Sequence, residues 1–193
     1  ASNLIKPSGG SVDVSVSNIG YVFQDATLLP WRNVKRNVEL FLELDNEPKE
    51  NWAPLVSDVI SLVGLEGFEG HFPRQLSGGM KMRVSLARAL TLNPKLFLFD
   101  EPFGALDEIS RERLNEELLK LFISEGFAGL FITHSVYEAV FLSTRVLVMS
   151  PQPGRISAEI EIPFEYPRHP ELRHSIEFGS LTGEVSEALR SGS

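Results

Sequence analysis

The sequence predicts an α/β fold: a mostly parallel sheet, a helical insertion and an antiparallel hairpin. Short apolar runs at 19–23, 96–99 and 130–132 have the composition of strands that are buried in a parallel sheet. Between the first two runs, residues 32–92 repeat apolar side chains at helical spacing. A Pro-Gly turn within 146–162 separates two further strand-like segments, which predicts the hairpin.

Composition excludes several classes of protein. The 193 residues include 18 Lys and Arg against 26 Asp and Glu, which gives a net charge of −8, and 42% of them are apolar. This is enough apolar material for one globular domain rather than a disordered chain. Since the sequence has no cysteine, it excludes disulfides and thiolate metal sites. Its acidity argues against nucleic acid as a partner, and no apolar run approaches the roughly 20 residues of a membrane span.

The remaining segments follow the same rules. Residues 1–10 pass from an apolar pair into a Pro-Ser-Gly-Gly turn, which predicts the end of a helix. Alternating valines at 12–16 predict a half-buried strand before the strand at 19–23. After the strand at 96–99, one helix face carries Leu114, Leu118, Leu121 and Phe122. Residues 163–193 predict a loosely packed tail with one amphipathic segment around 181–189.

Two adjacent carboxylates, Asp100 and Glu101, follow the apolar run 96–99. They therefore lie at the carboxyl end of a strand, where open α/β sheets bind ligands. The first suits Mg²⁺ or its water shell, and the second suits a general base for an attacking water. In isolation, a solvated turn after a strand is the favoured interpretation of this pair.

A second candidate site is the helix start at Ser77, Gly78 and Gly79. The N-terminus of a helix with a hydroxyl and no bulky side chains can bind an anion, and an ordinary Ser N-cap is the simpler alternative. The basic residues Lys81, Arg83 and Arg88 of this helix are interpreted as a solvated face rather than a nucleic-acid surface. The other histidines, His71, His169 and His174, are interpreted as surface residues.

Together these features resemble the nucleotide-binding subunit of ATP-binding cassette (ABC) transporters. Gln24 after its strand resembles the Q-loop, and Leu-Ser-Gly-Gly at 76–79 resembles the signature motif. Residues 96–101 resemble the Walker B strand with its catalytic glutamate, Ala-Leu-Asp at 105–107 resembles the D-loop, and His134 resembles the switch histidine. The match covers roughly residues 4–162, and the joint order of the motifs is very specific.

The resemblance implies roles at the nucleotide. Asp100, with Gln24, would hold Mg²⁺; Glu101 would activate the attacking water; His134 would contact the γ-phosphate. Gln24 would also sense that phosphate and face the membrane subunit. The cofactors implied are ATP and Mg²⁺.

The resemblance also implies partners. In this family two ATP-binding subunits form a head-to-tail dimer, so Ser77, Gly78 and Gly79 would cover the nucleotide held by the opposite subunit, and Asp107 would cross the interface. A transmembrane permease would be the second partner, and a solute-binding protein an indirect one. The subunit would be peripheral, at the cytoplasmic face of the inner membrane. Met80 departs from the usual glutamine after the double glycine, which removes a polar contact near the nucleotide.

The implied fold is a RecA-like P-loop NTPase core of the ABC type, incomplete at the N-terminus, with an inserted helical subdomain and an antiparallel edge hairpin. The core would comprise 1–31 and 93–162, the helical subdomain with the signature would comprise 32–92, and 163–193 would be the tail. An ABC ATPase of DNA repair or chromosome structure is the less favoured alternative, because the insert lacks long heptad arms.

Residues 27–34, Thr-Leu-Leu-Pro-Trp-Arg-Asn-Val, resemble the Q-loop region of bacterial importers for nitrate, sulfonates, taurine and similar compounds. The tail at 167–173 is similar to that group as well. The segment is also explained as a rigid apolar turn, and Trp31 suits a docking surface for a membrane subunit.

No Gly-Lys pair occurs in the sequence, so the P-loop pattern G-x-x-x-x-G-K-[ST] is missing. Residues 6–11 are rich in glycine, but their lysine precedes the glycines. Two explanations follow: the chain is a fragment of a complete ATPase, or it is a non-catalytic remnant or interaction module. The fragment is favoured because Glu101, His134 and the signature are intact. In either case the chain alone is expected to hydrolyse ATP poorly or not at all.

Overall fold

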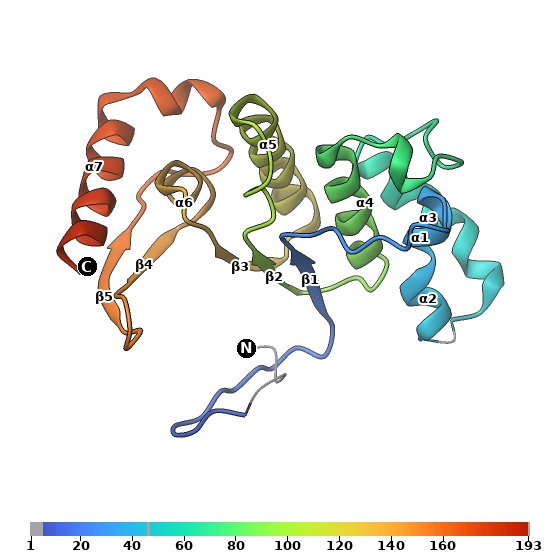
Figure 1. Ribbon diagram of the computed structural model, residues 1–193, viewed down its shortest axis with the longest axis horizontal. Coiled ribbons are helices and arrows are strands. Elements are labelled where there is room, and N and C mark those ends of the chain that lie inside the picture. The colour runs from blue at the N-terminus through green and yellow to red at the C-terminus, as the bar shows by residue number, and fades with distance from the viewer. Residues whose placement is uncertain (1–5, 46, 193) are drawn as a thin grey trace. The chain divides into compact units, whose positions relative to one another are not determined.

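A computed structural model describes residues 6–45 and 47–192, so the predicted helix end at 1–5 lies outside the described residues. The chain divides into two compact units (Figure 1). The first comprises the residues up to Arg111 together with Glu125–Ile132, and the second comprises Glu112–Ser124 together with the residues from Thr133 onward. The division into core, helical subdomain and tail drawn from the sequence is a different one and stays a prediction. In the described ranges, no helix is both long and apolar enough to cross a bilayer.

A parallel sheet organises the first unit. Its order is β1 (Ile19–Phe23), β2 (Leu96–Asp100) and β3 (Ala128–Ile132). The register pairs Phe23 with Asp100 and Asp100 with Ile132, so all three strands end at the same edge. The three predicted strands and their parallel arrangement are confirmed. Whatever follows each strand is thereby brought to one edge of the sheet.

The two faces of this sheet differ. One face buries Val22, Phe97 and Phe99, and Gly20 of β1 lies directly against the Phe97 ring. On β3, Leu130 and Ile132 are 48% and 53% exposed. The prediction that the run at 130–132 is buried is therefore wrong: β3 is an outer strand of the sheet that the described residues form, and its Leu130 and Ile132 are left exposed.

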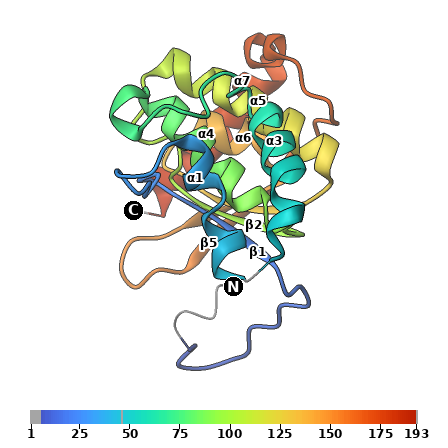
Figure 2. The same cartoon turned by 90° about the vertical axis from the view of Figure 1, so that its right-hand side faces the viewer.

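Helices form most of the segment between β1 and β2, as predicted for 32–92; Figure 2 turns α1, α3 and α4 toward the viewer. They are α1 (Val34–Val38), α2 (Leu40–Leu44), α3 (Trp52–Leu62) and α4 (Gly78–Leu90), with short 3₁₀ turns at Lys49–Asn51 and Pro73–Gln75. Their shared core consists of Val34, Val38, Val56, Ile60 and Val84, all at most 2% exposed. The helix predicted after β2 is α5 (Glu108–Glu125), which contributes residues to both units.

The second unit contains α6 (Val136–Leu142), the antiparallel pair β4 (Arg145–Met149) and β5 (Ile156–Glu161), a 3₁₀ turn at Pro170–His174, and α7 (Ile176–Ser191). The predicted hairpin is confirmed and forms a two-stranded sheet of its own. Phe141, Phe178 and Val185 lie at the centre of this unit's core.

The prediction of a loosely packed tail at 163–193 is wrong. Phe178 and Val185 of α7 are 0% and 2% exposed, so the amphipathic face packs into the core of the second unit. The Arg168 guanidinium is buried as well and donates to the carbonyl oxygens of Val140 and Phe141, at 3.1 and 2.8 Å. The prolines and charges of this segment suggested loose packing, but the charged Arg168 side chain caps the end of α6 instead.

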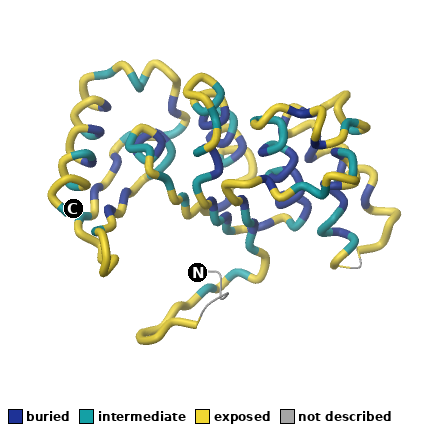
Figure 3. The backbone as a smooth tube through the Cα atoms, in the orientation of Figure 1, coloured by how far each residue is buried: buried dark blue, intermediate teal, exposed yellow. Residues whose placement is uncertain are grey.

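The strand predicted at 12–16 is also wrong: this stretch has no regular structure and its residues are exposed or half-buried (Figure 3). Alternating valines form a strand only where a partner strand and an apolar face are available. Among the described residues no strand pairs with this segment.

Candidate functional site

The ends of β1 and β2 bring Gln24 and Glu101 together. Both follow directly after strands that are paired in register, and they lie around Gly104. A Cβ atom placed on Gly104 would be 3.3 Å from Gln24 Nε2 and 3.4 Å from Glu101 Oε2. The absence of a side chain at Gly104 therefore lets an amide and a carboxylate share one small space. The sequence pattern did not single out this glycine.

Glu101 occupies an unusual backbone conformation. Its φ of 44° lies in the left-handed region, which favours glycine. The Glu101 N–H donates to the Ile132 carbonyl oxygen at 2.9 Å, and its own carbonyl accepts from the Gly104 N–H at 3.0 Å. These bonds hold the turn, and a strained residue held in this way at a strand end is typical of a functional position.

Asp100 is exposed at the same edge of the sheet. Its carboxylate and the Gln24 carbonyl oxygen are hard oxygen donors, which fit Mg²⁺ when phosphate oxygens and waters supply its other ligands. Within the described parts of the chain, no group of three or more His, Cys, Asp or Glu could hold a metal by itself. The donor set therefore suits a metal that arrives with a phosphate ligand rather than one in a protein cage.

The signature residues lie at the start of α4, as predicted. Ser77 is the N-cap, and its Oγ accepts from the Met80 N–H at 3.3 Å, so the simpler interpretation as a cap is confirmed. Gly78 faces Leu106 rather than the Gln24–Glu101 pair, because a Cβ on Gly78 would lie 3.1 Å from Leu106 Cδ2. The role of the exposed Ser77 and Gly78 and of the half-exposed Gly79 in anion binding stays a prediction.

Asp107 caps α5 in its own chain. Its Oδ1 accepts from the Ser110 N–H at 3.0 Å, and this bond holds the pKa of the Asp107 carboxyl below its ordinary value. Arg111 donates to the Leu106 carbonyl at 3.0 Å and pairs with Glu108 at 3.1 Å. The loop that presents Asp107 is thus fixed from the helix that follows it. A role of Asp107 across a dimer interface stays a prediction.

His134 belongs to the second unit, where it is exposed two residues after the end of β3 and just before α6. Its neighbours are firmly held: Thr133 Oγ1 donates to Glu138 and accepts from the Ser135 N–H, and Ser135 Oγ caps α6. Glu138 is 4% exposed and was missed at the level of sequence, although Ser-x-x-Glu before a helix is a recognisable capping signal. Of the remaining histidines, His169 and His174 are exposed as predicted, and His71 is half-buried against Phe68.

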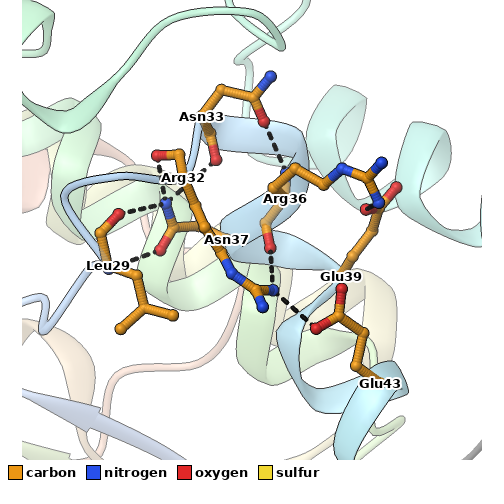
Figure 4. A network of polar contacts seen from close by, with 7 residues as sticks. All are labelled: Leu29, Arg32, Asn33, Arg36, Asn37, Glu39 and Glu43. Atoms are coloured by element: carbon orange, nitrogen blue, oxygen red, sulfur yellow. Dashed lines mark hydrogen bonds and ion pairs between the residues drawn. The ribbon is translucent and has the colours of Figure 1, made fainter.

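The segment after Gln24 is held from within by Asn37, which is fully buried (Figure 4). Asn37 Oδ1 accepts from the Leu29 N–H at 2.8 Å, and its Nδ2 donates to the carbonyls of Leu29, Arg32 and Asn33. The turn presents Trp31, which is 71% exposed, as the interpretation of a rigid apolar turn requires.

Arg88 corrects the prediction of a solvated basic face on α4. It is 5% exposed, and it donates to the Thr27 carbonyl at 3.0 Å, to the Ala26 carbonyl at 3.1 Å and to Thr27 Oγ1 at 3.1 Å. Burial lowers the pKa of its guanidinium. A signal was present in the sequence, because Arg88 comes four residues after Val84 and so lies on the core side of the helix.

Comparisons with known proteins agree with these motifs. The family model described as "ABC transporter" matches residues 4–104. An uncharacterized ABC transporter ATP-binding protein of Methanocaldococcus jannaschii is 50% identical over 171 residues, which cover 89% of this chain and 63% of the relative. The taurine import ATP-binding protein TauB of Rhizobium johnstonii is 41% identical over 188 residues, which cover 95% of this chain and 72% of the relative.

A solved structure is similar as well. It is the dimeric, post-hydrolysis state of an ATP-binding cassette bound to ADP and Pi, with a TM-score of 0.63 and 32% identity over 77% of this chain and 64% of that one. The chain thus spans less than two thirds of the length of the M. jannaschii relative and of this structure. The predicted RecA-like, ABC-type α/β fold is confirmed.

Proposed function

Because the chain belongs to the ABC transporter family of ATP-binding proteins, we propose that it acts in the ATP-hydrolysing, energy-coupling subunit of an importer for a small anion or organic compound such as nitrate, a sulfonate or taurine. One observation carries the proposal: Gln24 and Glu101 meet around Gly104 at the carboxyl edge of a parallel sheet. The name of the Rhizobium relative supports taurine and related compounds as the substrate class.

The roles at the nucleotide follow from donor chemistry. Asp100 and Gln24 supply oxygen ligands for Mg²⁺, which when bound neutralises charge on the phosphates. The Glu101 carboxylate accepts a proton from the attacking water, and His134 donates to the γ-phosphate. Glu101 sits in a turn held by backbone hydrogen bonds, so its position is preorganised before the nucleotide binds.

A second ATP-binding subunit completes the site. Ser77, Gly78 and Gly79 at the start of α4 present free backbone N–H groups to a phosphate held by the opposite subunit, and Asp107 crosses the same interface. A dimer bound to ADP and Pi in the related solved structure supports this arrangement. Closure of the two subunits is thereby coupled to hydrolysis.

A transmembrane permease is the second partner, and it docks on the segment that follows Gln24. The turn around Trp31 is rigid, apolar and exposed, which are the properties of a docking surface. The subunit then lies peripherally at the cytoplasmic face of the inner membrane, and the solute-binding protein acts on it only through the permease. Nucleic acid is not a partner, given the net charge of −8.

The 193 residues contain no Gly-Lys pair and so no P-loop lysine. In the P-loop pattern, that lysine and its glycine-rich loop bind the phosphates of the nucleotide. We expect the chain by itself to show little or no ATP turnover. A rate typical of complete cassettes that disappears in Glu101→Gln would contradict this expectation.

A genetic experiment tests the transport function. Deleting the gene should abolish growth on taurine, alkanesulfonates or nitrate as sole source of sulfur or nitrogen, with growth on sulfate and ammonium unchanged. The complete reading frame should restore growth, Glu101→Gln should not, and Glu112→Gln, which changes an exposed carboxylate outside the site, should do so.

The same experiment separates a second function, a non-catalytic module that pairs with an intact ATPase. Full restoration by Glu101→Gln would point to that module. Undisturbed growth of the deletion strain on all of these sources would overturn the importer assignment.

A further inference from the structure

We propose that Arg88 is a positioning residue for the nucleotide site: it ties the loop after Gln24 to α4, the helix that begins at the signature, and so holds Gln24 beside Gly104. The inference rests on the proposed function for the meaning of the site. The hydrogen bonds of Arg88 to the loop lie within the first unit, to which Gln24 and Glu101 also belong.

The guanidinium holds the loop by its backbone. Two carbonyl oxygens, those of Ala26 and Thr27, and the Thr27 hydroxyl accept from Arg88 at 3.0–3.1 Å. Ala26 is itself 7% exposed. The backbone is therefore held at Ala26, only two residues after Gln24, and this short distance along the chain limits how far Gln24 can move.

The loop needs such a fixture because Thr27 is strained. Its φ of 47° lies in the left-handed region, where a β-branched residue is a genuine outlier. Strained residues persist only where the surroundings over-determine them. Here Arg88 binds both the Thr27 carbonyl and hydroxyl, and Asp25 Oδ1 accepts from the Thr27 N–H at 3.0 Å.

A planar, multidentate cation is required for this role. The three acceptors of the loop, together with Ser85 Oγ at 3.5 Å, match the rigid fork of arginine, whereas a lysine ammonium is a compact point charge on a flexible stem. The Arg88 Cζ also lies 5.3 Å from the centroid of the Phe41 ring, which shields these bonds from water.

Helix α4 then links two parts of the proposed site. Arg88 is eleven residues after Ser77 on one helix, about 16 Å along its axis at roughly 1.5 Å per residue. One rigid element thus carries the signature at its start and the anchor of the Gln24 loop in its last turn. A movement of the signature by a partner subunit is transmitted to the Gln24 loop through Arg88.

Nuclear magnetic resonance of the full chain tests this without any nucleotide. The first readout is the NOE between the Gln24 side-chain amide and the Gly104 Hα, since the space beside Gly104 is filled by Gln24 Nε2. The second is hydrogen exchange at the Leu29 N–H, which is bonded to the buried Asn37. Both readouts are local, so they respond to the loop and not to overall stability.

In Arg88→Met, we expect the NOE to disappear and Leu29 exchange to accelerate by roughly tenfold or more, with exchange at Phe97 in the sheet unchanged. Arg83→Met is the matched control, because Arg83 lies on the same helix but donates to Val63, away from the loop. It should leave both readouts as they are. Arg88→Lys should restore them only in part.

Unchanged readouts in Arg88→Met, or equal acceleration at Leu29 and Phe97, would overturn the proposal. If Arg88→Met does not fold, Thr27→Val is the second variant: it keeps the side-chain shape but removes the hydroxyl acceptor, and it should weaken the NOE and speed Leu29 exchange. No effect of Thr27→Val on either readout would count against Arg88. The NMR results are independent of the growth experiment with Glu101→Gln. The proposed importer function and the proposed role of Arg88 can therefore fail separately.

Discussion

Gly20→Ala tests how tightly the sheet that carries Gln24 and Asp100 is packed. A Cβ at position 20 would lie 2.6 Å from Cε1 and 2.7 Å from Cδ1 of Phe97, whereas ordinary contacts begin near 3.4 Å. The Phe97 ring is fully buried and packs against Phe99 and Phe127, at centroid distances of 5.3 and 4.6 Å. The Phe97 ring therefore cannot move away from an added Cβ without displacing Phe99 or Phe127.

Overpacking of this kind costs about 1–3 kcal/mol, and replacing a strand glycine returns roughly 0.5 kcal/mol through backbone entropy. We expect Gly20→Ala to lower the free energy of unfolding of the first unit by about 2 kcal/mol. Urea titration followed by the fluorescence of Trp52, which is buried in the same unit, measures this change.

A double-mutant cycle decides whether the ring contact is the cause. Phe97→Leu frees the space that the new Cβ needs, so it should cost far less in the Gly20→Ala background than in the wild type, with a coupling of about 1–2 kcal/mol. Additive effects, within about 0.4 kcal/mol, would refute the reasoning, as would a stable Gly20→Ala single variant.

Three further changes act at other polar contacts. Arg168→Met leaves the last carbonyls of α6 without donors and should cost about 3 kcal/mol, seen as faster amide exchange throughout the second unit. Asn37→Ala removes the buried acceptor of the half-buried Leu29 N–H and should cost about 2 kcal/mol in urea titration; a loss under about 0.5 kcal/mol would contradict this. Ionised Asp107 stabilises α5 above about pH 4 and loses this effect as the pH falls through its lowered folded-state pKa; exchange at Ser110 should show this, and Asp107→Asn should remove the pH dependence.

Local patterns predicted the parts of the fold whose partners are nearby or repetitive. The apolar runs of β1 and β2 and the Ser77 cap of α4 are properties of a few consecutive residues, and all were predicted. The surroundings of Arg88 and Phe178 were not, because each depends on contacts made by segments distant in the sequence: Arg88 binds a loop 61 residues away. The alternating valines at 12–16 look like a strand locally, but no described strand lies beside them to pair with. The prediction from local pattern alone is therefore wrong there.

For the candidate site, motif order supplied the residues that are proposed, and their roles stay predictions; it could not reveal what supports them. Gly104 contributes by carrying no side chain where Gln24 and Glu101 lie, and Glu138 contributes by accepting a hydrogen bond from Thr133; neither contribution is visible in composition or periodicity. The capping signal at Glu138 was readable, whereas the fit around Gly104 needs coordinates.

The left-handed backbone at Glu101 places stability and function in opposition. A glycine would adopt this conformation without the penalty of about 1 kcal/mol that a side chain incurs, so Glu101→Gly is expected to make the fold more stable. If Glu101 activates water as proposed, its carboxylate stands at this position at a cost in backbone strain. Screening variants for thermal resistance alone would then select against the residue that the proposed chemistry needs.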